Sequence, residues 1–151
     1  AIIDTLDKLD KFDYSNPVVI KSTVPPGSCE AYARKYSLEI VFNPEFLRES
    51  TTPNSDFENQ DTVVIGTSNE NTFSAIKNMY AKVLIPKAKY YLVSLIEAEM
   101  IKCAQNTMLA SRVALANMIY DACEKNKVDY QKIKAANFVG GFFAIFVPSA
   151  A

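Results

Sequence analysis

Short runs of β-branched and aromatic residues alternate with segments of helical spacing along the first part of the chain, and this alternation limits the possible folds most strongly. The runs occupy residues 18–21, 39–43, 61–66 and 89–93. Polar or proline-containing turns interrupt them, as is typical where a strand ends. Strands that alternate with helices favour a mainly parallel sheet with helices packed on its faces. We therefore predict an α/β fold.

Helices are predicted before and between these strands. In the first dozen residues, apolar side chains recur every three or four positions, which predicts an amphipathic helix. A second helix is predicted over 29–37, with Ser28 as its N-cap. Because Cys29 falls in the first turn of this helix, it is the cysteine with an electrostatic reason to be a thiolate. A third helix is predicted over 70–84, with inward side chains at Phe73, Ile76, Met79, Tyr80 and Val83.

The segment from Leu95 to Lys125 contains neither glycine nor proline and is dense in strong helix formers. We predict one helix of roughly 30 residues and ~45 Å, which is too long to serve a single small sheet alone. The change in composition at its start predicts a domain boundary near Ser94, between residues 1–94 and 95–151. A shorter helix capped by Asp129 is predicted to follow, before an apolar tail for which no secondary structure is predicted.

Composition and charge exclude several classes of function. The 151-residue chain has a net charge of −1 and no basic stripe suited to nucleic acid. Its longest apolar stretch, residues 138–147, is too short to span a bilayer, and the N-terminus lacks the pattern of a secretory signal. Three widely spaced cysteines and the absence of histidine argue against a disulfide framework and a zinc site. We predict a cytoplasmic protein with no nucleic-acid partner, membrane segment or metal.

Polar side chains gather at three places that could form a site. These are Lys21-Ser22-Thr23, the segment 43–49 with Glu45 and Glu49, and Lys102 with Asn106 on the long helix. Ligands of parallel sheets bind at the loops after the carboxyl ends of strands, which makes these groups the candidate site. Glu45 and Glu49 are four residues apart and share one side if the segment is a helical turn. The structural alternative is a capped, solvated helix start after Pro44.

Lys102 and Asn106 share a helix face whose neighbours are apolar, so an ammonium and an amide project from core-like surface. A desolvated lysine beside a carboxylate can stabilise an oxyanion or shift a pKa, which lets an acid, a base and a charge stabiliser share one pocket. The alternative is a lysine whose alkyl stem covers apolar surface while its ammonium reaches solvent. The spacing leaves both interpretations open.

Motifs in four regions of the chain give the sequence a resemblance to a known family. They are Val19-Ile20-Lys21-Ser22-Thr23-Val24-Pro25, Asn43-Pro44-Glu45-Phe46-Leu47-Arg48-Glu49, Val63-Val64-Ile65-Gly66, and Glu97-Ala98-Glu99-Met100-Ile101-Lys102 with Asn106-Thr107-Met108-Leu109-Ala110. In this order and at similar separations, they resemble the UDP-glucose and GDP-mannose dehydrogenase family. The match runs from about Val18 to Ile133, and several independent motifs make it far more specific than any one of them.

The resemblance implies a fold, a cofactor and a partner. Residues 1–94 are similar to the C-terminal part of the family's Rossmann-like NAD-binding domain. Residues 95–151 are similar to the start of its central helical dimerisation domain, followed by the atypical apolar tail. In that family the long helix helps to build the dimer, which implies a homodimer through residues 95–125. The family oxidises a primary alcohol of a nucleotide sugar to a carboxylate in two steps, with NAD as the cofactor.

The resemblance also implies roles for individual side chains. Glu45 is similar to the acid or base that assists hydrolysis of a thioester intermediate, and Thr23 acts near the reacting centre through a water. Lys102 and Asn106 are similar to the groups that stabilise and orient the substrate oxygen. The implied cofactor contacts are Lys21, Ser22, Thr23 and Glu49. The implied contacts to the nucleotide sugar are Glu45, Phe46, Leu47, Arg48, Glu49, Lys102 and Asn106.

Two departures from the family pattern limit what this chain is expected to do. No GxGxxG fingerprint can be built from its four glycines, so the usual pyrophosphate cradle is missing. None of its three cysteines occupies the place of the family's nucleophilic cysteine. We therefore predict a portion of an NAD-dependent dehydrogenase that oxidises UDP-glucose to UDP-glucuronate, incomplete as it stands. The GDP-mannose or UDP-N-acetylmannosamine branch of the family, and a non-catalytic dimerising module, are the alternatives.

Overall fold

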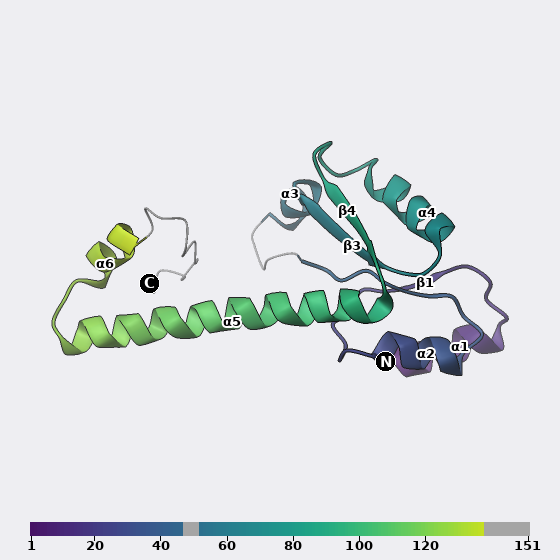
Figure 1. Cartoon of the computed structure of the whole chain (residues 1–151), viewed down its shortest axis with the longest axis horizontal. Helices are drawn as coiled ribbons and strands as arrows, with labels where there is room; N and C mark the ends of the chain where they lie inside the picture. The colour runs from purple at the N-terminus through teal and green to yellow at the C-terminus, as the bar shows by residue number, and fades with distance from the viewer. Residues whose placement is uncertain (47–51, 138–151) are drawn as a thin grey trace. The chain divides into compact units, whose positions relative to one another are not determined.

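The computed structural model describes residues 1–46 and 52–137. The secondary structure follows the order α1 (Ile2–Lys11), β1 (Val18–Ile20), α2 (Ser28–Lys35), β2 (Ile40–Phe42), α3 (Pro53–Glu58), β3 (Thr62–Gly66), α4 (Glu70–Tyr80), β4 (Lys89–Val93), α5 (Leu95–Lys125) and α6 (Tyr130–Asn137) (Figure 1). The chain divides into two compact units, the first from Ala1 to Cys103 and the second from Ala104 onward. The domain boundary near Ser94 stays a prediction.

The four strands form one sheet in the order β1-β2-β3-β4. β1 runs parallel to β2, and β3 runs parallel to β4, with a helix in each of these connections. Parallel neighbours need such a crossover, which is why the strand and helix signals alternate in the sequence. β2 and β3 are antiparallel and come into register at Phe42 and Gly66. The predicted α/β fold, with a mainly parallel sheet, flanking helices and a long helix, is confirmed.

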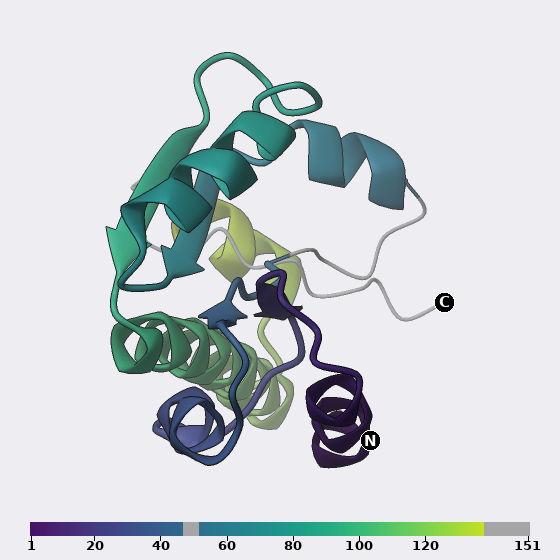
Figure 2. The same cartoon turned by 90° about the vertical axis from the view of Figure 1, so that its right-hand side faces the viewer.

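Helices cover both faces of the sheet. One apolar cluster, between the sheet and α1, α2 and the start of α5, includes Leu6, Cys29, Phe42, Val64 and Ala98. The other, between the sheet and α3 and α4, includes Val63, Ile65, Ile76 and Tyr80. Figure 2 shows α1 and α2 on one side of the strands and α3 and α4 on the other. Adjacent residues of β3 therefore pack in clusters on opposite faces of the sheet, which explains why that strand is apolar at successive positions.

The predicted helices are confirmed, but α2 ends at Lys35 rather than at residue 37, and the end of α4 also differs. α5 has the predicted bounds and runs for 31 residues. α6 starts after Asp129, whose Oδ1 accepts a hydrogen bond from the Gln131 backbone N at 2.9 Å, so the predicted cap is present. α4 ends at Tyr80, earlier than predicted, and Met79 and Val83 are exposed where an inward position was predicted. None of the helices in the described part of the chain combines the length and apolar content needed to cross a membrane.

The N-terminus of α2 is capped by a side chain from another helix. Gly27 is its N-cap residue with φ of 89°, and the Ser28 hydroxyl donates instead to the Pro25 carbonyl at 2.6 Å. The N-cap predicted at Ser28 is therefore wrong, because the chain turns one residue earlier, in the left-handed region that favours glycine. Glu99 of α5 accepts hydrogen bonds from the backbone N of Gly27 and, at 2.7 Å, of Cys29. Free N–H groups and the helix dipole both favour a carboxylate there.

Burial and the neighbouring Glu99 together set the pKa of the Cys29 thiol. Both residues are fully buried. Burial first, and then the hydrogen bond and charge of Glu99, raise the pKa of the Cys29 thiol. Burial of the thiol, and then the neighbouring Glu99 carboxyl group, therefore oppose the thiolate suggested by its place in the helix.

Gly66 lets α5 start close against the end of β3. An ideal Cβ at this position would lie 2.8 Å from the Ala98 Cβ, 3.1 Å from the Ser94 carbonyl oxygen and 3.3 Å from the Leu95 Cα. Side chains do not pack this closely, so glycine is required for the contact. Together, Gly66 and Glu99 fix the first turns of α5 on the first unit, and these turns lead directly to Lys102.

Candidate functional site

The ammonium of Lys21, just after β1, lies among three oxygen atoms. Its Nζ donates to Asn43 Oδ1 at 3.1 Å and to Tyr80 Oη at 2.9 Å, and forms an ion pair with Glu45 Oε2 at 3.2 Å. It also lies 5.6 Å from the centre of the Tyr80 ring. Asn43 and Glu45 come from the loop after β2, and Tyr80 is the last residue of α4. Three segments distant in sequence thus meet at this ammonium.

Asn43 and Tyr80 form the buried base of this cluster. They are 2% and 7% exposed, respectively. The Tyr80 hydroxyl donates to Asn43 Oδ1 at 2.6 Å, and Asn43 Nδ2 donates to the Val64 carbonyl at 2.7 Å. The Tyr80 ring packs at a centroid distance of 5.8 Å from the Phe57 ring. Both polar side chains therefore have the partners that burial requires.

Lys102 reaches the same loop from α5. Its Nζ donates to the backbone carbonyl of Glu45 and lies 5.2 Å from the centre of the Phe46 ring. Glu45 is thus contacted by two ammonium groups, Lys21 at its carboxylate and Lys102 at its carbonyl. Four of the residues selected from the sequence are therefore neighbours in the structure.

Of the other selected residues, the structure describes Ser22, Thr23 and Asn106. Ser22 and Thr23 are exposed beyond the end of β1. Asn106 is exposed on α5, in the second compact unit. The roles implied for these side chains stay predictions. Outside the described residues lie Leu47, Arg48 and Glu49.

Sequence reasoning assigned no partner to two buried polar residues of this site, Asn43 and Tyr80, nor to the buried Glu99 of α5. It predicted Tyr80 as an inward core residue but gave its hydroxyl no role, although a buried tyrosine usually needs a partner for its O–H. It included Asn43 only as part of a polar segment, without a partner. Glu99 looked like one more charge on a long helix, and nothing in the sequence indicates that the N-terminus of α2 lies beside it.

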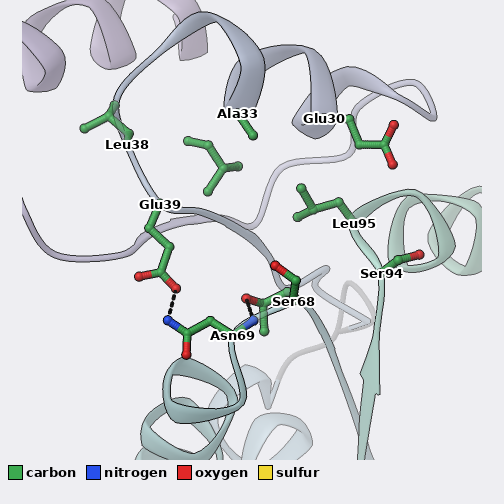
Figure 3. A pocket seen from close by; sticks show the side chains of 10 residues that line it. Glu30, Ala33, Leu38, Glu39, Ser68, Asn69, Ser94 and Leu95 are labelled. Carbon is green, nitrogen blue, oxygen red and sulfur yellow. Dashed lines mark hydrogen bonds between the residues drawn. The ribbon is translucent and has the colours of Figure 1, made fainter.

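A cavity of about 500 Å³ lies elsewhere on the first unit, between α2, the start of β2 and the ends of β3 and β4 (Figure 3). Its walls include Glu30, Leu38, Glu39, Asn69 and Leu95. The Glu39 carboxylate accepts from Asn69 Nδ2 at 3.0 Å and from Thr72 Oγ1 at 2.6 Å, so it is engaged within the protein. The described residues that line this cavity include none of those selected from the sequence.

Two family models match the chain. One describes the NAD binding domain of the UDP-glucose/GDP-mannose dehydrogenase family and matches residues 1–84. The chain belongs to this family. The model of the family's central domain matches residues 96–140, which include most of α5 and all of α6. The resemblance found in the sequence motifs is thereby confirmed.

Members of the UDP-glucose/GDP-mannose dehydrogenase family share both sequence and fold with this chain. UDP-glucose 6-dehydrogenase of Rickettsia typhi is 38% identical over 130 residues, covering 82% of this chain and 30% of the relative. A solved UDP-glucose dehydrogenase from Pyrobaculum islandicum has a TM-score of 0.70 at 29% identity, covering 83% of this chain and 30% of that one. A solved GDP-mannose dehydrogenase from Pseudomonas aeruginosa has a TM-score of 0.69 at 26% identity, covering 85% and 31%. This chain spans about 30% of the length of these relatives.

Proposed function

We propose that this chain is a portion of an NAD-dependent dehydrogenase that oxidises UDP-glucose to UDP-glucuronate in two steps. The observation that carries the proposal is the meeting of Glu45 with the ammonium groups of Lys21 and Lys102. An acid–base group beside fixed positive charge is what an alcohol oxidation and a later hydrolysis require. The relatives named UDP-glucose 6-dehydrogenase support UDP-glucose as the substrate.

In the proposed reaction, Lys102 stabilises negative charge that develops on the substrate oxygen. Its ammonium is held by the Glu45 carbonyl and the Phe46 ring before any substrate arrives, so little reorganisation is needed. Glu45 serves as the acid or base in the hydrolysis of a thioester, which needs a nucleophilic cysteine that none of the three cysteines of this chain is expected to supply. In this proposal Asn106 orients the substrate oxygen, and Thr23 acts through a water. These two roles rest on the resemblance alone.

The described residues do not fit the pyrophosphate of NAD. A phosphate usually binds at free N–H groups of a helix N-terminus next to glycine. The N-terminus of α2 follows Gly27, but the Glu99 carboxylate already binds its backbone N–H groups and would repel a phosphate. Close to Gly66, the first turn of α5 fills the space that a phosphate would need. The proposed oxidation therefore depends on a cofactor cradle that these residues do not provide.

Calorimetric titration of UDP-glucose into the purified chain tests the proposal. We expect binding that Lys102→Ala weakens about ten- to a hundredfold, since a hydrogen bond from a charged group contributes about 1.5–3 kcal/mol. Lys125→Ala, an exposed lysine at the end of the same helix, is the matched control and should leave binding unchanged. NAD should bind weakly in a parallel titration.

The outcomes of this titration separate the proposal from its alternatives. Tighter binding of GDP-mannose or UDP-N-acetylmannosamine than of UDP-glucose would favour the other branches of the family. Equal affinity in the wild-type chain and Lys102→Ala would remove the role proposed for Lys102. No binding of any of these nucleotide sugars would leave the non-catalytic dimerising module as the better interpretation.

We also propose that the chain forms a homodimer through α5. This helix exposes large apolar side chains, which include Met108, Leu109, Val113 and Met118. Exposed apolar residues gathered on one element mark interaction surfaces. Sedimentation velocity should show a dimer that Leu109→Glu dissociates. Lys125→Glu adds a carboxylate at the exposed C-terminal end of α5, beyond these apolar side chains, and should leave the dimer intact. A monomeric wild-type chain would contradict the proposal.

A further inference from the structure

The ammonium of Lys21 has all of its hydrogen-bonding capacity engaged. A lysine ammonium carries three N–H donors and no acceptor. Three oxygens lie within 3.2 Å of Lys21 Nζ, from Asn43, Tyr80 and Glu45. The donors are thus matched by oxygens of the protein itself. A phosphate or ribose of a cofactor could contact Lys21 only by displacing one of them.

Two of these three oxygens belong to a rigid, buried base. Asn43 is tied to the neighbouring strands through its backbone N, which donates to the Ile20 carbonyl at 2.9 Å, and through its amide, which donates to Val64. Tyr80 is anchored by its ring and by the bond from its hydroxyl to Asn43. Burying an amide and a phenol is unfavourable unless both are paired. Their geometry therefore depends on the network that also holds Lys21.

The Glu45 carboxylate is the remaining partner, and it is the accessible one. Its side chain is 35% exposed and that of Lys21 is 41% exposed. An ion pair with this exposure contributes little to stability, partly because two long side chains must be ordered. Here Lys21 is already ordered by Asn43 and Tyr80. The ion pair therefore adds little to the stability of the fold. Its main effect is to set the orientation of the Glu45 carboxylate.

We propose that Lys21, held by Asn43 and Tyr80, is a positioning residue that fixes the carboxylate of Glu45. Its partners differ from the cofactor contact that the resemblance implies for Lys21. The inference rests on the proposed function, since it assigns to Lys21 and Tyr80 a part in orienting the acid–base group of that reaction. Lys102 holds the backbone carbonyl of Glu45, and Lys21 holds its side-chain carboxylate. Both the backbone and the side chain of Glu45 are therefore fixed.

NMR of the ligand-free chain tests the proposal with Tyr80→Phe, which removes one oxygen and keeps the ring. In the wild-type chain the two γ-protons of Glu45 should have distinct shifts, because the carboxylate is held in one orientation. In Tyr80→Phe and in Lys21→Met the two shifts should converge, while the shifts of core methyl groups stay in place. Tyr90→Phe is the matched control, since the centre of the Tyr90 ring also lies near a lysine, at 5.7 Å from Lys77 Nζ, but its hydroxyl is not among the three oxygens around Lys21.

Each result has a defined meaning. Converged Glu45 shifts in the wild-type chain, or distinct shifts that survive both Tyr80→Phe and Lys21→Met, would overturn the positioning role. If Tyr80→Phe fails to fold, Lys21→Met decides the question, because Lys21 is exposed and contributes little to the core. The measurement needs no nucleotide sugar, so a positive result alongside failed UDP-glucose binding would count against the proposed function only. Normal binding with unresponsive Glu45 shifts would count against the positioning role only.

Discussion

Replacing Glu99 with glutamine is expected to lower the free energy of unfolding by about 2–4 kcal/mol. The carboxyl group is fully buried, and its two oxygens accept hydrogen bonds from the backbone N of Gly27 and of Cys29. Glutamine has nearly the same shape, but its NH₂ group cannot accept a hydrogen bond. One N–H at the start of α2 would lose its partner, and both would lose a charge-assisted bond. Urea unfolding followed by circular dichroism measures the change.

The control for Glu99 is Glu124→Gln, which removes an exposed carboxylate near the other end of α5. Surface substitutions of this kind usually change stability by less than about 0.5 kcal/mol. A similar small change for Glu99→Gln would show that Glu99 does not cap α2 in solution. Glu99 fixes the first turns of α5 and is three residues before Lys102. Its replacement should therefore also weaken any UDP-glucose binding that depends on Lys102.

Replacing Gly66 with alanine is expected to lower the free energy of unfolding by about 1–3 kcal/mol, the usual cost of overpacking. The new Cβ would meet the Ala98 Cβ at 2.8 Å and the Ser94 carbonyl oxygen at 3.1 Å. Two of the three close atoms belong to the backbone of the chain entering α5, so they cannot rotate away. Denaturant unfolding of the variant measures the loss.

A double variant shows whether the clash with Ala98 is the cause. Ala98→Gly alone should destabilise the chain by roughly 1 kcal/mol, because glycine weakens a helix interior. In Gly66→Ala with Ala98→Gly, the loss should be smaller than the sum of the two single losses, since the closest atom is gone. Additive losses would mean that β3 and α5 are not in contact at this point.

The fold could be predicted largely because its signals are local. α5 was predictable to its terminal residues, since a long stretch without glycine or proline has few structures other than a helix. The alternation of strands and helices likewise predicted the mainly parallel sheet. The N-cap of α2 was not predictable, because its partner Glu99 lies 70 residues or more away and local rules favour Ser28. The antiparallel pairing of β2 and β3 also leaves no clear local signature.

The candidate site could be predicted in part. Glu45 and Lys102 were selected because polar groups after strands and on an apolar helix face are unusual, and the family motifs contain both. Their contact, and the ion pair of Lys21 with Glu45, depend on how β1, β2 and α5 pack. Tyr80 could not be selected, because an aromatic residue on the inner side of a helix is the ordinary composition of a core.

The antiparallel step between β2 and β3 gives the sheet two opposite polarities. The strands β1 and β2 end toward Lys21 and Glu45, whereas β3 and β4 run the other way and end at the cavity beside Asn69. Loops that follow strand ends, where ligands of such sheets bind, therefore open at both ends of one small sheet. Changes in the loop after β3, residues 67–69, can accumulate without touching the cluster around Glu45, whereas the turn after β4 leads into α5 and so to Lys102. The two ends of the sheet are thus joined through α5, and only the loop after β3 is free to diverge by itself.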